Sequence, residues 1–215
     1  MFADLIDTLP PPWRLALSYA PGPVKERWLT LLALDERLGG VARPVLIGGR
    51  EPIMAQIRLA WWRDRLREPA AQWPKGEPLL AALACWDDGH GALGALVDGW
   101  EALLADRPLN MTTVAQFVAG RQAACAALAG GSDDALATMA RGWALGDLIP
   151  LLAAPEEQAM LAQMTAAQPA RLPRLSRAMR PLVVLAGLAQ RVQKGGKLDN
   201  FGAFAASIRL GLFGT

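Results

Sequence analysis

Apolar side chains recur at helical spacing along most of this 215-residue chain, and proline and glycine residues separate the segments in which they do so. Ala and Leu, which favour helices, supply most of the apolar fraction of 53%, whereas β-branched residues are few. The pattern predicts an all-α fold, a bundle of about eight or nine helices. The length suits one domain with a substantial core, spanning residues 1–215.

The predicted helices follow from this spacing and from the residues that end each segment. They cover residues 2–8, 13–19, 24–38, 51–68, 77–87, 92–105, 112–129, 133–153, 155–166, 172–193 and 201–213. An N-terminal arm, 1–22, and a C-terminal amphipathic tail, 198–215, flank the bundle. Gly39-Gly40 is expected to weaken or end the first long helix, and residues 43–49 are expected to form a loop.

The segment 51–68 is the one around which the other helices are expected to pack. Pro52 suits the first turn of a helix, and Pro69 stops it. One face carries Ile53, Ile57, Ala60 and Trp61. Adjacent residues point about 100° apart on a helix, so Trp61 and Trp62 lie on different faces. We expect at least one of them to be buried, with neighbouring helices on more than one side.

Composition and charge narrow the possible classes of function. The net charge of +2 and the lack of a recognisable nucleic-acid motif argue against binding to nucleic acid. Cys85 and Cys125 are expected to be buried free thiols of a reducing compartment. The N-terminus is not a signal peptide, and no uncharged apolar run reaches the ~18 residues that would span a bilayer. These features predict a cytoplasmic protein, with attachment to the surface of the inner membrane left open.

A run of cations without acids marks the last third of the chain. Its members include Arg171, Arg174, Arg177 and Arg180. One interpretation is a solvated face balanced by an acidic neighbour across the bundle. The other is an interface for anionic lipid headgroups or for an acidic protein partner.

Few residues suggest a metal or a catalytic centre. His90 is the only histidine and lies in a glycine-rich turn, where we expect a surface loop. The adjacent acid pairs Asp87-Asp88, Asp133-Asp134 and Glu156-Glu157 fall at predicted helix ends, and none has a further acid at the i+4 position. No metal ligands are therefore predicted from these residues.

Several segments resemble the squalene/phytoene synthase family. They are 17–21 (LSYAP), 31–43 (LLALDERLGGVAR), 56–66 (QIRLAWWRDRL), 97–103 (VDGWEAL) and 142–146 (GWALG). The resemblance covers the chain to about Arg191, with a shortened C-terminus. It implies an all-α bundle around a central cavity. It also implies head-to-head joining of two prenyl diphosphates, which two aspartate-rich motifs bind through magnesium ions.

The chain departs from the family at both aspartate-rich motifs. Gly39, Gly40 and Arg43 stand where the first motif is expected. In the second, Asp147 is the only acid, and Pro150 interrupts the helix that should carry the motif. Each diphosphate carries about three negative charges, and burying them unpaired costs several kcal/mol or more per charge. Catalysis by the family's mechanism is therefore disfavoured.

Two functions follow from the resemblance. The first is a non-catalytic protein, similar to the complex I assembly factor branch, that acts in lipid or isoprenoid binding or in membrane-complex assembly and needs no cofactor. The second is an active prenyltransferase of isoprenoid, carotenoid or hopanoid biosynthesis. Its reduced magnesium site would consist of Asp35, Glu36 and Asp147. A third option is a helical scaffold that binds no ligand.

The resemblance also implies substrate-binding residues. They are Tyr19, Arg37, Arg58, Arg63 and Trp62. The alternative for this set is structural: the tryptophans belong to the core, and Arg63 pairs with an acid of a neighbouring helix.

Overall fold

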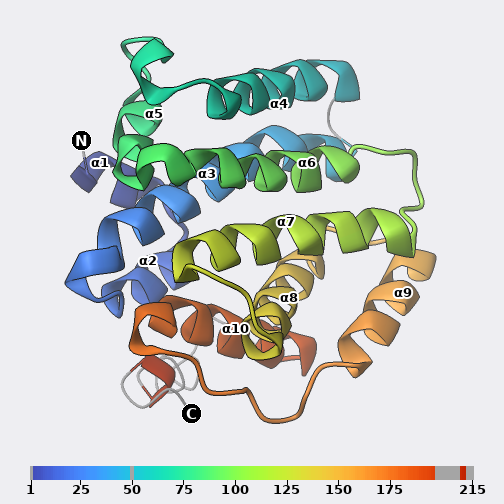
Figure 1. The fold of residues 1–215 in the computed structure, drawn as a ribbon. Coiled ribbons are helices and arrows are strands. Elements are labelled where there is room, and N and C mark those ends of the chain that lie inside the picture. The colour runs from blue at the N-terminus through green and yellow to red at the C-terminus, as the bar shows by residue number, and fades with distance from the viewer. Residues whose placement is uncertain (1, 49–50, 197–208, 212–215) are drawn as a thin grey trace.

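The computed structural model describes residues 2–48, 51–196 and 209–211, and within them it contains helices and no strand, which confirms the predicted all-α class (Figure 1). The α-helices are α1 (Phe2–Thr8), α2 (Pro11–Ser18), α3 (Gly22–Leu46), α4 (Pro52–Arg67), α5 (Pro78–Leu83), α6 (Gly94–Ala102), α7 (Met111–Ala129), α8 (Asp134–Leu148), α9 (Pro155–Ala166) and α10 (Arg180–Gln193). Three 3-10 segments are η1 (Ala70–Gln72), η2 (Ala84–Leu93) and η3 (Arg177–Met179). No helix in this part of the chain is long and apolar enough to cross a membrane.

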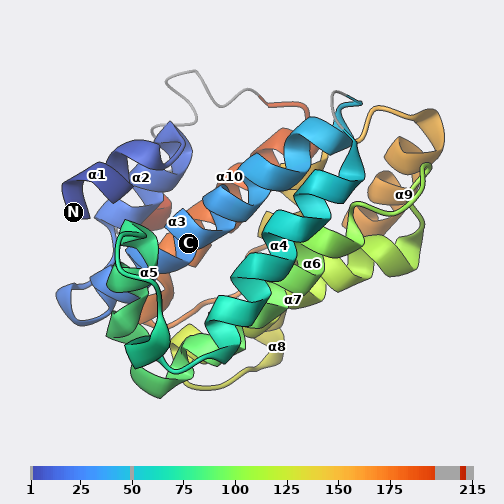
Figure 2. The ribbon, with the colours of Figure 1, turned by 90° about the horizontal axis from the view of Figure 1, so that it is seen from above.

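The helices form a layered bundle. α6 packs against α7 on one side and against α4 on the other, while α8 and α10 pack together across α7 from α6 (Figures 1 and 2). α3 runs between the α4–α6 layer and the N-terminal helices. The buried apolar residues form one continuous core, in which Trp28, Trp100 and Trp143 are the largest side chains.

Glycines allow a close approach of the helices at the α6–α7 and α8–α10 crossings. A Cβ on Gly120 of α7 would collide with the backbone carbonyl of Ala95, in the first turn of α6. A Cβ on Gly146 of α8 would collide with Ala189 of α10. Because neither neighbour is the end of a flexible side chain, these positions require glycine for packing.

The first long helix was predicted to end or weaken at Gly39-Gly40, and it does not. α3 continues through both glycines and through Pro44 to Leu46, so the predicted loop at 43–49 is wrong. A Cβ on Gly39 would lie 2.6 Å from Nη2 of Arg43 and 3.0 Å from Cζ2 of Trp100. Gly39 therefore serves close packing within a helix, not a turn.

Other observed helix boundaries differ from the predicted ones, and prolines or capping residues explain them. α8 ends at Leu148, before Pro150, rather than at 153. Residues 171–176 are not helical, and α10 begins only at Arg180, just before Pro181. Asn110 caps α7 by accepting a hydrogen bond from the Thr113 N–H at 3.0 Å. The predicted segment 201–213 lies mostly outside the described residues.

α4 is an outer helix, and the face on which it was expected to pack is exposed. Ile53 is 61% exposed, Ile57 57% and Trp61 39%, whereas Leu59 and Trp62 are buried. The expectation that one tryptophan is buried is confirmed, and the expectation of neighbours on more than one side is wrong. The helix carries two apolar stripes, and spacing alone does not distinguish which of them packs against α3 and α6.

His90 is not on the surface as predicted. It is 7% exposed, its Nδ1 lies 2.6 Å from the Asp87 carbonyl oxygen, and its Nε2 lies 3.0 Å from the Glu68 carbonyl oxygen. The ring also meets Trp73 edge-on, with centroids 4.8 Å apart. His90 thus ties the end of α4 to η2, which explains why a glycine-rich turn holds a buried imidazole.

Candidate functional site

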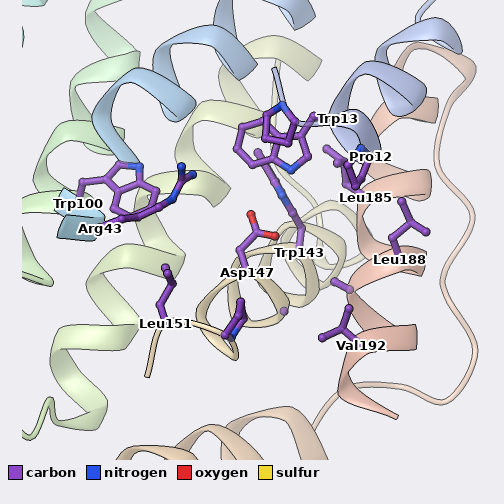
Figure 3. A pocket seen from close by; sticks show the side chains of 14 residues that line it. Pro12, Trp13, Arg43, Trp100, Trp143, Asp147, Leu151, Leu185, Leu188 and Val192 are labelled. Atoms are coloured by element: carbon purple, nitrogen blue, oxygen red, sulfur yellow. The ribbon is translucent and has the colours of Figure 1, made fainter. Parts of the chain in front are cut away.

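A hollow of about 250 Å³ lies between α2, α3, α6, α8 and α10 (Figure 3). Its lining residues are Pro10, Pro12, Trp13, Arg43, Trp100, Trp143, Gly146, Asp147, Pro150, Leu151, Leu185, Leu188, Ala189 and Val192. The carboxylate of Asp147 projects in the middle, with Arg43 and Trp100 on one side and the leucines of α10 on the other (Figure 3). The hollow thus combines an apolar wall with a small polar patch.

Arg121 of α7 joins two acids at the base of this region. Its Nη1 donates to Oδ2 of Asp147 at 2.8 Å, and its Nη2 lies 2.9 Å from Oδ2 of Asp35. The second contact is an ion pair in which the N–H is poorly directed at the oxygen. Arg121 and Asp35 are both completely buried. One guanidinium therefore serves as the counter-ion of two carboxylates from different helices.

Aromatic rings enclose this guanidinium. The Cζ of Arg121 lies 4.1 Å from the ring centroid of Trp143, 4.8 Å from Phe117, 5.6 Å from Trp13 and 5.9 Å from Trp100. A cation–π contact of a desolvated cation stabilises it by about 2 kcal/mol or more. The rings exclude water, so the ion pairs with Arg121 are the main compensation for the charge of Asp35.

Asp35 comes from the buried face of α3 and has a second partner. Trp100 Nε1 donates to its Oδ1 at 2.6 Å. Burial raises the pKa of the Asp35 carboxyl above its usual value, while the charge of Arg121 and the Trp100 hydrogen bond oppose the rise. Asp35 therefore depends on Arg121 to remain ionised.

Arg43, one turn beyond Gly39, is held by a different acid. Its Nη1 and Nη2 donate to the two carboxylate oxygens of Glu36 at 2.7 and 2.8 Å, and its Cζ lies 5.5 Å from the Trp100 centroid. Burial acts to lower the pKa of Arg43, but the hydrogen bonds and charge of Glu36 outweigh it, so the pKa is raised. Arg43 stays charged at the edge of the hollow.

Two polar atoms of α8 at the hollow lack a protein partner. The buried Nε1 of Trp143 has no hydrogen-bond acceptor within the described part of the chain. Asp147 is 31% exposed, and its Oδ1 makes no hydrogen bond with a described residue. A buried unpaired donor costs about 1–3 kcal/mol, so Trp143 Nε1 is a place where an added acceptor would stabilise the protein. The two residues are four apart and share one helix face.

The three acids predicted for a reduced metal site do not form one group of ligands in the structure. Asp35 and Asp147 converge, but the guanidinium of Arg121 lies between them, while Glu36 binds Arg43. Among the described residues, no three His, Cys, Asp or Glu side chains are grouped as metal ligands. The donor set does not fit the clustered magnesium ions that the resemblance implies.

The predicted substrate-binding residues lie away from this hollow. Arg37 and Arg58 line a separate open depression of about 320 Å³ between α1, α3, α4 and α5. Arg37 also pairs with Glu77 at 3.5 Å and lies 6.0 Å over the ring of Trp62. Tyr19 is half-buried.

Arg63 binds acids of a neighbouring helix, in agreement with the structural alternative. Its Nε donates to Asp98 at 2.7 Å, and its Nη2 pairs with Glu101. These contacts join α4 to α6, and Arg63 does not line the hollow.

Sequence reasoning missed Arg121, the residue that organises the site. A signal existed: Arg121 is the only charged residue of α7, and it stands among alanines in a strongly apolar segment. An isolated cation at such a position is almost always paired in the core. The sequence could not indicate which acids are its partners, because they lie on α3 and α8.

Comparison with protein-family models, curated proteins and solved structures finds no match for this chain. The kinship with the squalene/phytoene synthases therefore stays a prediction from the residues quoted above.

Proposed function

We propose that this protein is a non-catalytic relative of the squalene/phytoene synthases that binds an isoprenoid-like or other apolar lipid. The observation that supports this proposal best is the position of Arg121. Its guanidinium lies between Asp35 and Asp147, the two acids that a reduced magnesium site would need. A cation fixed by the protein at this place disfavours a metal ion by charge and by space.

The electrostatics around the hollow also disfavour diphosphates. Asp35, Glu36 and Asp147 face Arg43 and Arg121, and with all five ionised they sum to one negative charge. A diphosphate with about three negative charges would meet net repulsion there, and both Nη atoms of Arg43 are already used by Glu36. Ionisation of a prenyl diphosphate needs cations that neutralise the leaving group.

The size and walls of the hollow suit a single apolar chain. Its volume of about 250 Å³ lies below the ~300 Å³ at which sites for drug-sized ligands begin, so two prenyl chains do not fit. Leu185, Leu188 and Val192 give one wall an aliphatic surface, and Trp13 and Trp143 add aromatic faces.

The proposal is tested by two measurements on the purified full chain. Farnesyl diphosphate with Mg²⁺ should give no release of pyrophosphate above the buffer rate, and native mass spectrometry followed by extraction should identify an apolar molecule. Pyrophosphate release that requires Mg²⁺ and is abolished in Asp147→Asn would establish the alternative, an active prenyltransferase with a reduced metal site.

The exposed face of α4 favours a second candidate function, attachment to an anionic membrane surface. Ile53, Ile57 and Trp61 form an exposed stripe, with Arg58 and Arg67 on its two sides. Neither arginine has an ion-pair partner among the described residues, and Asp64 is the only acid of the helix. An apolar stripe with flanking cations is typical of helices that lie in a membrane interface.

The arginines predicted to dock on a membrane lie elsewhere. Arg171, Arg174 and Arg177 are exposed in the segment between α9 and α10, on the side of the bundle opposite α4 (Figure 1). No exposed large apolar residue accompanies them in the described chain. Flotation with vesicles of anionic lipid should therefore be lost in Ile57→Glu and kept in Arg174→Gln. The reverse pattern would assign attachment to the arginine segment.

A further inference from the structure

We infer that the ligand of the hollow carries a neutral hydroxyl group at the end of a single apolar chain. This inference rests on the proposed binding function and names the chemistry of its ligand. Trp143 Nε1 is a buried donor without an acceptor, and Asp147 Oδ1 is an acceptor without a donor among the described residues. The two lie one turn apart on the same face of α8, and both residues line the hollow.

A hydroxyl group can satisfy both atoms at once. Its oxygen accepts from the Trp143 N–H, and its hydrogen is donated to Asp147 Oδ1. A carboxylate or a phosphate only accepts hydrogen bonds and would repel Asp147, whereas an ammonium only donates and would leave the Trp143 N–H unpaired. The hydroxyl thus fits the donor and acceptor inventory of this patch.

The rest of the hollow fits the remainder of such a ligand. The side chains of α10 lie across from Asp147 and provide an aliphatic wall for a chain that extends from the hydroxyl (Figure 3). The net negative charge of the surrounding ionised groups favours a neutral ligand over an anionic one. The volume of about 250 Å³ accommodates one short chain.

The test uses four ten-carbon probes that share one chain: geraniol, geranic acid, geranylamine and geranyl diphosphate. Binding to the full chain is followed by the indole N–H signals in ¹⁵N-labelled protein, with the Trp143 signal assigned from Trp143→Phe. We expect geraniol to bind most tightly and to move the Trp143 signal downfield. Trp143→Phe keeps an aromatic face but removes the N–H donor together with part of the indole, and should weaken geraniol binding by about three- to tenfold. Trp73→Phe, which removes an indole N–H outside the hollow, is the matched control and should leave geraniol binding unchanged.

Every other outcome contradicts either the hydroxyl assignment or the proposed binding function. Tighter binding of geranylamine, geranic acid or geranyl diphosphate than of geraniol overturns the hydroxyl assignment while the binding function stands. The hydroxyl assignment is also overturned if geraniol binds equally well to the wild type and to Trp143→Phe, and the two proteins unfold at the same temperature. Failure of all four probes to bind contradicts the proposed function itself, and the hydroxyl inference with it.

Discussion

Arg121 is the residue on which the interior depends most. Its replacement by Met keeps an unbranched chain of similar length but leaves Asp35 buried with only the Trp100 hydrogen bond. Breaking a buried ion pair in this way typically costs about 3–5 kcal/mol. Denaturant unfolding of Arg121→Met should show a loss of this size.

A double variant separates charge from packing at this site. In Asp35→Asn with Arg121→Met the uncompensated charge is gone, and Asn still accepts from Trp100, so part of the lost stability should return. Arg14→Met, which removes an exposed ion pair to Asp7 at 3.9 Å, is the control and should change stability by about 0.5 kcal/mol or less. If Arg121→Met is as mild as this control, the buried pair is not the stabilising contact described above.

The two thiols differ in environment and should differ in reactivity. Cys125 is completely buried, and burial raises the pKa of its thiol to about 12, whereas Cys85 is half-buried with a raised pKa. Because the thiolate is the reacting form, the native protein at pH 8 should react with a thiol reagent slowly and at Cys85 first. Cys125 should react only in denaturant.

The pKa of Cys125 also predicts the direction of the alkaline response. In the unfolded chain this thiol ionises near pH 8.5, whereas in the folded chain it stays protonated to about pH 12. Its contribution to stability is therefore complete below pH 8.5 and decreases as the pH rises toward 12. In Cys125→Ala the free energy of unfolding should fall less steeply over this range, and an unchanged slope would contradict the assignment.

At the scale of the elements, the α6–α7 crossing depends on a glycine. Gly120→Ala places a methyl group against the Ala95 carbonyl, which is backbone and cannot move independently, so a loss of about 1–3 kcal/mol is expected. Gly40→Ala in α3 is the matched control, because nothing lies within 4 Å of its Cβ and alanine favours a helix by ~1 kcal/mol. Thermal unfolding should shift down in the first variant and up in the second.

At the scale of the whole molecule, local patterns predicted the helical class well and the arrangement of helices less well. The spacing of apolar residues located the long helices, and 155–166 was placed within the bounds of α9. The continuation of α3 through Gly39 was missed because packing against Trp100 and Arg43, which spacing does not reveal, overrides the low helix propensity of glycine.

The site could be predicted only in part, because its central cation also depends on tertiary contacts. Asp35 and Asp147 were identified as the acids of a reduced site, and the structure brings them together. The cation between them comes from a third helix, α7, so its role depends on tertiary contacts that no local pattern encodes. Trp61 shows the same limit, since the choice of buried face on α4 is made by α3 and α6.

The guanidinium of Arg121 stands where a metal ion between Asp35 and Asp147 would lie. Electron paramagnetic resonance with Mn²⁺, which substitutes for Mg²⁺, measures whether a divalent ion binds to the protein. We expect the full chain to leave the Mn²⁺ spectrum as it is in buffer alone and, in the presence of farnesyl diphosphate, as it is with the same farnesyl diphosphate and no protein. One Mn²⁺ bound per chain, and released in Asp35→Asn and in Asp147→Asn, would contradict this expectation.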